Sequence, residues 1–229
     1  MKIGIIGAGN IGGTLTRRLI SLGHKVCVAN SRGPETLKDF AKETRAKVVT
    51  VKEAVRGVDL VVVAIPEARV TELPKNLFAG VPEKVVVVDT GNYYPRERDG
   101  RIEDIEAGLT ESRWVQRQLG RPVIKAFNNI YARDLMSAGR PPGTPHRIAL
   151  PVAGDDRAAK EEVMRLVEAL GFDAIDAGGL DESWRQQPGT PVYGTNLDAA
   201  GVKRALADAS PQRPAAFSAS GEESHAHPA

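Results

Sequence analysis

Short runs of apolar, mostly β-branched residues recur along the chain, and they alternate with longer segments whose apolar residues lie three or four positions apart. The short runs predict strands at Lys2–Ile6, Lys25–Ala29, Ala46–Val51, Asp59–Ile65, Glu83–Asp89, Arg121–Ala126, Arg147–Ala153 and Phe172–Asp176. The longer segments predict helices at Thr14–Leu22, Glu35–Glu43, Glu111–Leu119, Tyr131–Ala138, Asp156–Leu170 and Leu197–Ala209. Several strands are apolar throughout, which is typical of strands covered on both faces. The alternation therefore predicts an α/β fold with a doubly wound, mainly parallel sheet and a small C-terminal extension.

The same pattern divides the chain unequally. We expect one domain over residues 1–180, with a core that ends near residue 150 and a further βαβ-like part up to 180. Residues 181–209 are expected to form a small segment that completes a cleft. Residues 210–229 are rich in Ser, Ala, Pro and Glu, and they predict a disordered tail because they cannot bury enough apolar surface to fold. The polar connection Thr90–Thr110 has a length that is usually functional or disordered.

Composition narrows the chemistry. The single cysteine, Cys27, excludes a disulfide framework, and four histidines leave few ligands for a Cys/His zinc site. Two of them, His225 and His227, lie in the expected tail, where a solvated segment is favoured over weak metal binding. We therefore predict no metal site and assign no catalytic side chain. With so few cysteines and histidines, the composition indicates that a bound cofactor carries the chemistry.

Charge and hydropathy exclude further classes of protein. The chain has 31 basic and 29 acidic residues among 229, and this net charge of +2 has no clustered runs. Such a balance is not the footprint of a nucleic-acid-binding protein. No apolar stretch approaches the roughly 20 residues that a membrane helix needs. The first residues enter a predicted strand directly, so we expect a cytoplasmic protein that binds neither nucleic acid nor membrane.

A glycine-rich turn joins the first predicted strand to the first helix. Its residues form a G-x-G-x-x-G pattern: Gly7, Ala8, Gly9, Asn10, Ile11 and Gly12. In this context the first glycine permits the tight turn, the second lets a pyrophosphate approach the backbone, and the third lets the helix pack against the strand. The helix N-terminus then offers N–H groups to an anion. We favour dinucleotide binding over a turn that needs glycine only for its backbone angles.

The end of the second predicted strand indicates which dinucleotide is bound. A site selective for NAD places a carboxylate there, whereas this chain has Asn30, Ser31 and Arg32. A hydroxyl and a guanidinium suit a 2′-phosphate, because the planar guanidinium donates two hydrogen bonds at once. We therefore predict NADP(H) recognition, with a surface arginine in a turn as the alternative.

Later strand ends are expected to line the same cleft, since ligands of open α/β sheets bind beyond the carboxyl ends of the strands. The predicted cofactor contacts there are Ala64, Ile65, Pro66, Asn92, Ala126 and Asn128. Asn128 either binds the nicotinamide carboxamide or caps the helix near Tyr131. Tyr93 and Tyr94 either stack on a flat substrate or, as we favour, pack over the sheet edge.

The chain resembles the F420-dependent NADP oxidoreductases and their bacterial relatives, and also the oxidoreductase domain of the STEAP metalloreductases. The resemblance rests on the glycine turn and on five further blocks, which are Asn30–Arg32, Val62–Pro66, Val123–Ile130, Leu150–Asp156 and Asp176–Leu180. Together they cover residues 1 to 180 in order, and the last three blocks are more specific than the glycine turn.

The resemblance implies a Rossmann domain that binds NADP(H) through the glycine turn and through Ser31 and Arg32. It also implies a homodimer, and a cleft where F420 or a flavin stacks on the nicotinamide and exchanges a hydride with it. Such a step needs little side-chain acid–base chemistry, because the cofactors carry the reactivity. After Leu180 the chain departs from the family pattern, since Trp184–Tyr193 is polar and broken by prolines. The small-molecule redox acceptor is therefore left open.

Three alternatives remain at this point. The first is a sensor or regulatory module that binds NADPH without turning it over. The second is a reductase of another small molecule or of a ferric substrate. The third is a β-hydroxyacid dehydrogenase or an imine or pyrroline reductase, which begins with a similar glycine turn. That third class needs a helical second domain of order 100 residues, and we expect the segment after Leu180 to be too short for it.

Overall fold

The computed structural model of the chain describes residues 1–219. Six parallel strands form one sheet in the order β3-β2-β1-β4-β5-β6. The strands are β1 (Lys2–Ile6), β2 (Lys25–Ala29), β3 (Lys47–Val48), β4 (Leu60–Val63), β5 (Val86–Asp89) and β6 (Ile124–Lys125). This is the strand order of the Rossmann fold, so the predicted fold class is confirmed. The order reverses between β1 and β4, which marks the place where such sheets bind nucleotides.

A second, smaller sheet follows the first. Its two strands, β7 (Ala149–Val152) and β8 (Asp173–Asp176), are parallel and are connected by the helix α7 (Arg157–Ala169). An antiparallel bridge between Lys125 and Ala153 joins β6 to the end of β7. All eight predicted strands are present, most of them shorter than the apolar runs that predicted them.

The predicted helices are also present. The α-helices of the described residues are α1 (Asn10–Ser21), α2 (Lys38–Thr44), α3 (Val51–Ala54), α4 (Glu103–Glu106), α5 (Glu111–Leu119), α6 (Ala132–Ser137), α7 and α8 (Ala199–Ala207). The 3-10 helices are η1 (Pro34–Leu37), η2 (Glu67–Glu72), η4 (Leu180–Gln186) and η5 (Ala215–Phe217), and η3 (Pro95–Asp99) is a π-helix. The sequence did not predict α3, α4 or the short η elements after η1, because they are too brief to show a helical period.

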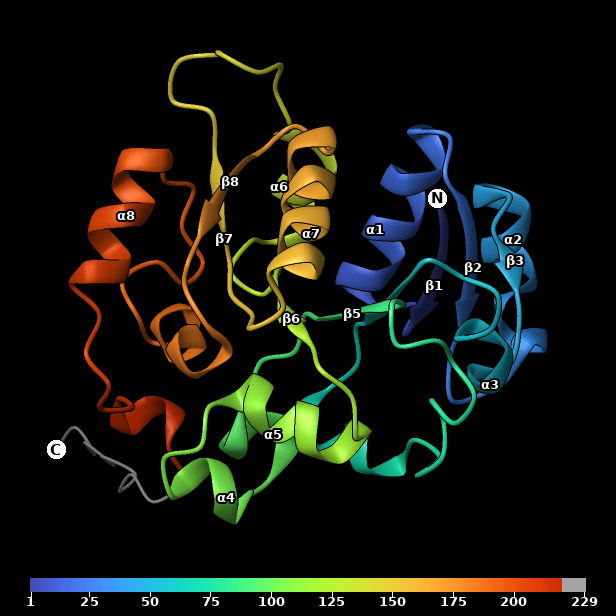
Figure 1. Cartoon of the computed structure of the whole chain (residues 1–229), viewed down its shortest axis with the longest axis horizontal. Coiled ribbons are helices and arrows are strands. Elements are labelled where there is room, and N and C mark those ends of the chain that lie inside the picture. Colours follow the sequence, from blue (N-terminus) through green and yellow to red (C-terminus); the bar gives the residue numbers. More distant parts are fainter. Residues whose placement is uncertain (220–229) are drawn as a thin grey trace, which may run out of the picture.

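The main sheet is covered on both faces, as its continuous apolar strands require. Along β4, Leu60 and Val62 point to the core that α1, α6 and α7 cover, whereas Val61 and Val63 point to the core that α5 covers. Figure 1 shows the first three strands and α1 on one side of the molecule and the β7–β8 sheet with α7 and α8 on the other, with β5 and β6 between them.

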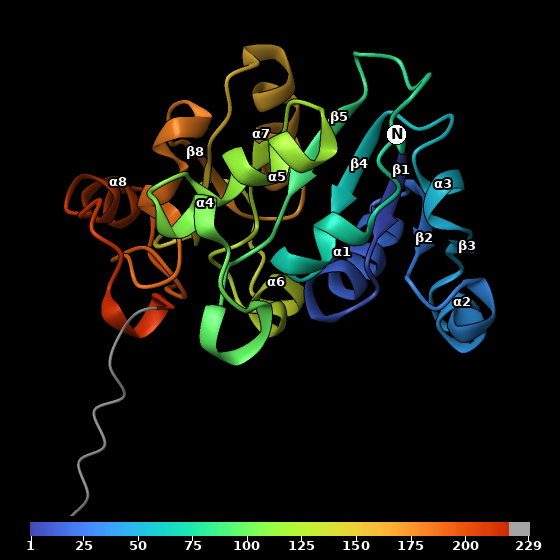
Figure 2. The ribbon, with the colours of Figure 1, turned by 90° about the horizontal axis from the view of Figure 1, so that it is seen from below.

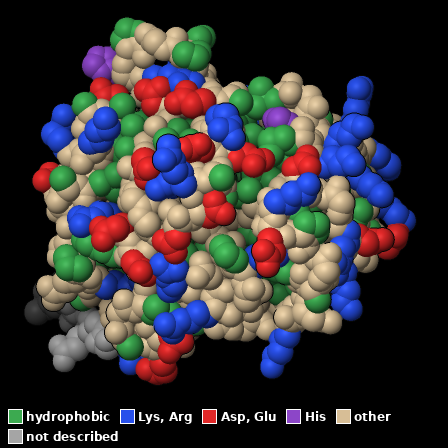
Figure 3. Space-filling model, viewed as in Figure 1, with side chains coloured by type: hydrophobic (Ala, Val, Ile, Leu, Met, Phe, Trp, Pro, Cys, Tyr) green, Lys and Arg blue, Asp and Glu red, His purple; other side chains and the backbone are tan. Residues whose placement is uncertain are grey.

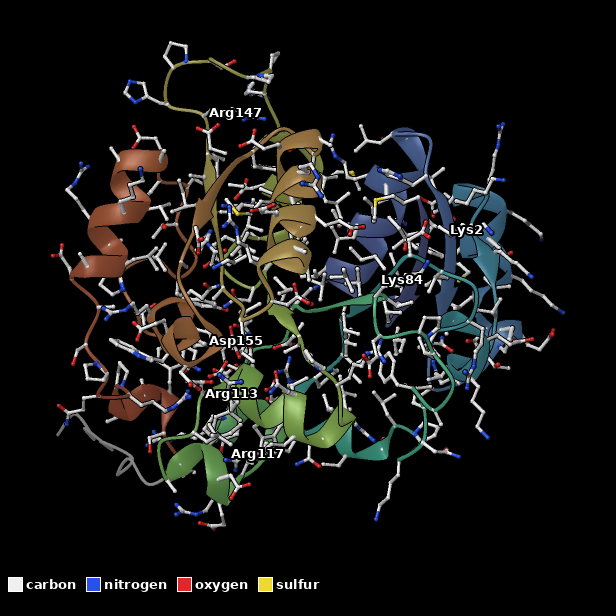
Figure 4. All side chains as sticks on the ribbon, viewed as in Figure 1. Lys2, Lys84, Arg113, Arg117, Arg147 and Asp155 are labelled. Carbon is white, nitrogen blue, oxygen red and sulfur yellow. The ribbon has the colours of Figure 1, made fainter. Side chains whose placement is uncertain are left out.

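Arg113 of α5 joins the two sheets. Its guanidinium donates to Asp155, which precedes α7, and to Asp181 of η4, both at 2.8 Å, and Figure 4 shows Arg113 and Asp155 next to each other. The helix α8 then packs on β7 and β8 through Val202, Ala205 and other apolar residues. In Figure 2, α8 and α2 lie at opposite ends of the molecule.

The C-terminal segment differs from the sequence prediction over residues 210–219. This part of the predicted tail is ordered: η5 lies within it, and Arg213 forms an ion pair with the buried Glu111. A composition rule cannot foresee such a contact, because the partner lies 102 positions away in the sequence. Residues 220–229, including His225 and His227, lie outside the described residues. No helix within residues 1–219 is long and apolar enough to span a membrane.

Candidate functional site: a cleft along the carboxyl ends of the strands

The glycine turn has the geometry that its sequence predicts. Gly7 has a φ of 108°, and a Cβ atom at this position would overlap the carbonyl oxygen of Ala64. A Cβ atom on Gly12 would overlap the carbonyl oxygen of Gly7. Gly9 differs, because a Cβ atom there would meet no atom of residues 1–219 within 4 Å. The first and third glycines therefore shape the turn, while the second leaves space open beside the backbone.

The N-terminus of α1 points its free N–H groups toward this open space. Gly9 is the N-cap residue, so no side chain accepts hydrogen bonds from the first turn, and that turn contains no acidic residue. The unpaired N–H groups and the helix dipole together favour an anion there. A cavity of about 430 Å³ lies beside the turn and is lined by Ala8, Gly9, Asn10, Thr14 and Arg133 among others.

One end of the cleft, which we name the phosphate end, is a cavity of about 920 Å³ lined by Asn30, Ser31, Arg32 and Lys52 together with apolar residues such as Ile65 and Pro66. The Asn30 side chain shapes the loop itself. It donates to the Thr36 hydroxyl at 2.8 Å and accepts from the N–H of Arg32 at 3.1 Å. Ser31 and Arg32 are exposed, and within residues 1–219 the Arg32 guanidinium has no hydrogen bond or ion pair.

The other end, which we name the ring end, is a cavity of about 410 Å³ that follows the ends of β4, β5 and β6. Ile65, Pro66, Asn92, Tyr94, Tyr131 and Tyr193 are among the residues that line it. The hydroxyl groups of Tyr94 and Tyr193 are hydrogen-bonded to each other. Burial raises the pKa of both tyrosines, so both phenols are neutral at pH 7. Three aromatic rings and an apolar pair therefore surround a space next to the glycine turn.

A network of amides holds the ring end in shape. The Asn128 side chain donates to the Asn92 side chain and to the Gln186 carbonyl oxygen, and it accepts from the Gln186 side chain. Asn128 does not cap α6, whose N-cap is Tyr131, so that alternative is wrong. Its preceding residue, Phe127, is buried with a φ of 62°, a rare conformation for an aromatic residue, and this bend turns the chain toward Asn92.

Ala126 is not brought to the cleft. It is fully buried in the core on the α1 side of the sheet, because it still follows the β6 direction and its N–H donates to the carbonyl oxygen of Asp89. The two loop tyrosines differ in their surroundings. Tyr93 is fully buried and its hydroxyl accepts from the N–H of Ile102, whereas Tyr94 faces the ring end.

A buried ion pair lies beneath the loop that lines the ring end. The Lys125 Nζ donates to Asp89 Oδ2 at 3.1 Å and to the Gly91 carbonyl oxygen at 2.6 Å. The other oxygen of Asp89 accepts from the Gly91 N–H, and Ser112 donates to Oδ2. Although burial lowers the pKa of Lys125, the carboxylates of Asp89, Glu67 and Glu111 raise it more, and the net shift is upward. Lys125 is therefore charged. It holds the Gly91 carbonyl oxygen, while Asp89 holds the Gly91 N–H.

Glu67 lies against the same glycine and has no exposed surface. Among residues 1–219 neither of its carboxyl oxygens has a hydrogen-bond partner, and a Cβ atom on Gly91 would overlap one of them. Burial, and then the nearby charge of Asp89, raises the pKa of Glu67 well above its usual value. Glu67 is therefore harder to ionise than a carboxylic acid in water.

The C-terminal segment closes the outer side of this cluster. Arg213 donates to the fully buried Glu111 at 2.9 Å, and its guanidinium lies over the Tyr93 ring at 5.3 Å from the centroid. The Phe217 ring packs against Tyr94 with 6.3 Å between centroids. The C-terminal segment thus packs against Tyr94 of the ring end and neutralises Glu111 behind it.

Sequence reasoning missed most of this support. The alternation of Lys125 with the apolar Ile124 and Ala126 predicts a partly exposed or ion-paired structural lysine, and the structure gives the ion-paired form in full burial. Nothing local in the sequence marks Glu67, Glu111 or Tyr193. Lys52 follows the third strand within the pattern Thr50-x-x-Glu53, a capping box that sequence alone reveals.

Comparisons with known proteins bear on this site. Residues 2–93 match the model of the coenzyme F420-dependent NADP oxidoreductase family. The Escherichia coli (strain K12) protein YjhV is 41% identical over 86 residues, which are 38% of this chain and 56% of that protein. The metalloreductase STEAP3 of Rattus norvegicus is 28% identical over 180 residues, 78% of this chain and 34% of that protein. The matches thus span about half and a third of these two relatives.

Two solved structures resemble most of the fold. A hypothetical protein from Sinorhizobium meliloti has a TM-score of 0.72 at 29% identity, over 86% of this chain and 95% of the other. A protein from an Arthrobacter species, described as an F420-dependent NADP reductase, has a TM-score of 0.64 at 26% identity, over 78% of this chain and 85% of the other. The resemblance predicted from the sequence is confirmed, and the chain is related to NADP-dependent oxidoreductases.

Proposed function

We propose that this protein is an NADPH-dependent oxidoreductase that transfers a hydride between NADP(H) and a flavin-like or deazaflavin acceptor. The observation that carries the proposal is the open space over Gly9, a residue that lines both the ring end and the cavity beside the glycine turn. A dinucleotide fits this arrangement, because its pyrophosphate needs close approach to the backbone at the start of α1. The family match of residues 2–93 supports the same nucleotide.

The chain's own residues suggest how the nucleotide is held. The N–H groups at the start of α1 bind the pyrophosphate, and Ser31 with Arg32 bind the 2′-phosphate. The apolar residues Ile65 and Pro66 line both ends of the cleft, so they lie along the length of the bound molecule. No carboxylate is present at Asn30–Arg32 that would accept a hydrogen bond from the ribose 2′-hydroxyl of NADH or repel the 2′-phosphate of NADPH.

The ring end suits a flat redox partner. Tyr94, Tyr131 and Tyr193 offer aromatic surface, and Tyr131 is 54% exposed although it is a large ring. The bound nicotinamide supplies the hydride, so the protein has to place two rings face to face and exclude water. The fixed loop at Gly91 and Asn92 maintains that spacing, because buried charges and amides hold it from behind.

The experiment is a spectrophotometric screen that follows NADPH oxidation with F420, FMN, FAD, quinones and ferric chelates. We expect turnover with a deazaflavin or a flavin, and faster turnover with NADPH than with NADH. Preferred reduction of ferric chelates would instead favour the ferric reductase alternative, to which the similarity with STEAP3 points. Tight NADPH binding without turnover in the whole panel would contradict the proposal and favour a sensor.

A further inference from the structure

The phosphate end contains a second loop that the sequence did not connect with nucleotide binding. The strands β2 and β3 are neighbours, with Val28 paired to Val48, and the N–H of Val49 donates to the Val28 carbonyl oxygen at 3.0 Å. Two residues beyond each member of this pair, the chain leaves the sheet at the same edge. Ser31 and Arg32 follow β2, Lys52 follows β3, and all three line the same cavity.

The backbone that carries Lys52 is fixed. Thr50 caps α3, since its hydroxyl accepts from the Glu53 N–H and the Glu53 carboxylate accepts from the Thr50 N–H at 2.8 Å. The Glu53 carboxylate is therefore hydrogen-bonded to Thr50 and forms no ion pair with the neighbouring Lys52 within residues 1–219. Lys52 is exposed, and within residues 1–219 its ammonium group has no hydrogen bond or ion pair.

The remaining charges of the cavity are already satisfied. Arg69 donates to Glu72 at 2.6 Å, so these two lining residues neutralise each other. Arg32 and Lys52 are therefore the two unpaired cations among the described residues that line the phosphate end. Figure 3 shows that Lys and Arg side chains gather at the right-hand edge of the molecule, where α2 and α3 lie in Figure 1.

We propose that Lys52 binds the 2′-phosphate of NADPH together with Ser31 and Arg32, and that it is a specificity-determining residue for NADPH over NADH. A phosphate monoester offers three acceptor oxygens and a charge near −2, which one guanidinium does not neutralise. The planar fork of Arg32 and the compact ammonium of Lys52 approach such a group from two adjacent loops. This inference rests on the proposed function, since it requires NADP(H) in the cleft.

The test is an equilibrium titration of NADPH and of NADH, which differ only in the 2′-phosphate. We expect Lys52→Met, which keeps the aliphatic stem, to raise the Kd for NADPH about tenfold and to leave the Kd for NADH within about twofold. Lys52→Arg keeps the charge and should retain most of the preference. The matched control is Lys47→Met, because Lys47 is also exposed and lies on β3 but outside the cavity lining.

Competition with adenosine 2′-monophosphate and adenosine 5′-monophosphate separates the phosphate site from a general charge effect. Lys52→Met should weaken the 2′-isomer selectively, and equal weakening of both isomers would overturn the inference. An unchanged ratio of NADPH to NADH affinity in Lys52→Met, with wild-type protein still preferring NADPH, would also overturn it and leave the proposed function intact. A wild-type protein that binds neither nucleotide would instead refute the proposed function.

Discussion

The two ends of the cleft are built by opposite means. At the phosphate end, two exposed cations, unpaired within residues 1–219, stand on short loops that follow β2 and β3. At the ring end, the loop at Gly91 and Asn92 is fixed from behind by Lys125 and Asp89, which are almost completely buried. Exposed cations cost little stability and are available to a ligand, whereas buried charges hold a backbone in place only while they stay paired. Substitutions at the phosphate end should therefore change nucleotide affinity, and substitutions beneath the ring end should change stability first.

The largest effect is expected at Lys125. Lys125→Met leaves Asp89 buried without a cation, and Asp89 then keeps hydrogen bonds only from the Ser112 hydroxyl and the Gly91 N–H. The substitution also removes the hydrogen bond to the Gly91 carbonyl oxygen. Removal of one partner of a buried pair typically costs about 3–5 kcal/mol in the free energy of unfolding. Urea denaturation measures this loss. Arg32→Ala, measured alongside, should lie within about 0.5 kcal/mol of wild type, and equal stability of the two variants would remove the contrast between the ends.

The next effect concerns the glycine turn, which borders the ring end. Gly9→Val has space for its side chain in the protein alone and an ordinary φ of −77°, so the fold should persist. The new side chain fills the place of the pyrophosphate and should raise the Kd for NADPH and for NADH alike, on the order of 100-fold. Isothermal titration measures both constants. Gly12→Ala should behave differently and lower the stability itself, because its Cβ atom overlaps the Gly7 carbonyl oxygen.

A smaller and more selective effect is expected at Arg32. Arg32→Ala removes charge-assisted hydrogen bonds to a 2′-phosphate, and it should raise the KM for NADPH roughly 10- to 100-fold. The KM for NADH should change little, since NADH lacks that phosphate. Steady-state rates with the best acceptor measure the two values, and equal changes for both nucleotides would show that Arg32 does not recognise the phosphate.

The last effect is a pH dependence that arises from Glu67. Burial and the nearby Asp89 raise the pKa of Glu67 in the folded protein. Its contribution to the free energy of unfolding is therefore fully present below the unfolded pKa of about 4.3. That contribution is lost as the pH rises toward the folded pKa. Glu67→Gln removes this loss of stability with rising pH, because glutamine does not ionise. The variant should gain about 1.4 kcal/mol over wild type for each pH unit inside that window.

Urea unfolding at several pH values tests the Glu67 prediction. The exposed Glu83→Gln serves as the control and should show a difference from wild type that does not grow with pH. A constant difference for Glu67→Gln as well would mean that Glu67 is ionised in the folded protein.

The same contrast explains what the sequence could and could not predict. The eight strands follow from contiguous apolar runs, and Ser31 and Arg32 follow from their place after a strand, so both are local signals. The support of the ring end depends on pairs that are distant in sequence. Lys125 and Asp89 are 36 positions apart, and Arg213 and Glu111 are 102 apart. Hydropathy alone assigns Glu67 and Glu111 to the surface, because a carboxyl group is rarely buried without a cation or a proton.

The predicted cofactor contacts also differ in how far they depend on local sequence. Residues predicted to contact a ligand through their backbone, such as Gly9, need only the local turn, and the structure gives that turn as expected. Side chains at strand ends are harder to place, since one step in the chain turns a residue from the cleft to the core. Ala126 is buried for this reason, and Asn128 is reached only through the unusual backbone of Phe127.

The most direct test of the account is a crystal structure of the protein with NADPH. We predict the 2′-phosphate within hydrogen-bonding distance of Ser31 and Arg32, the pyrophosphate over Gly9, and the nicotinamide in the cavity that Asn92, Tyr94 and Tyr193 line. A nucleotide bound in the reverse direction, or one whose 2′-phosphate touches neither Ser31 nor Arg32, would contradict the account.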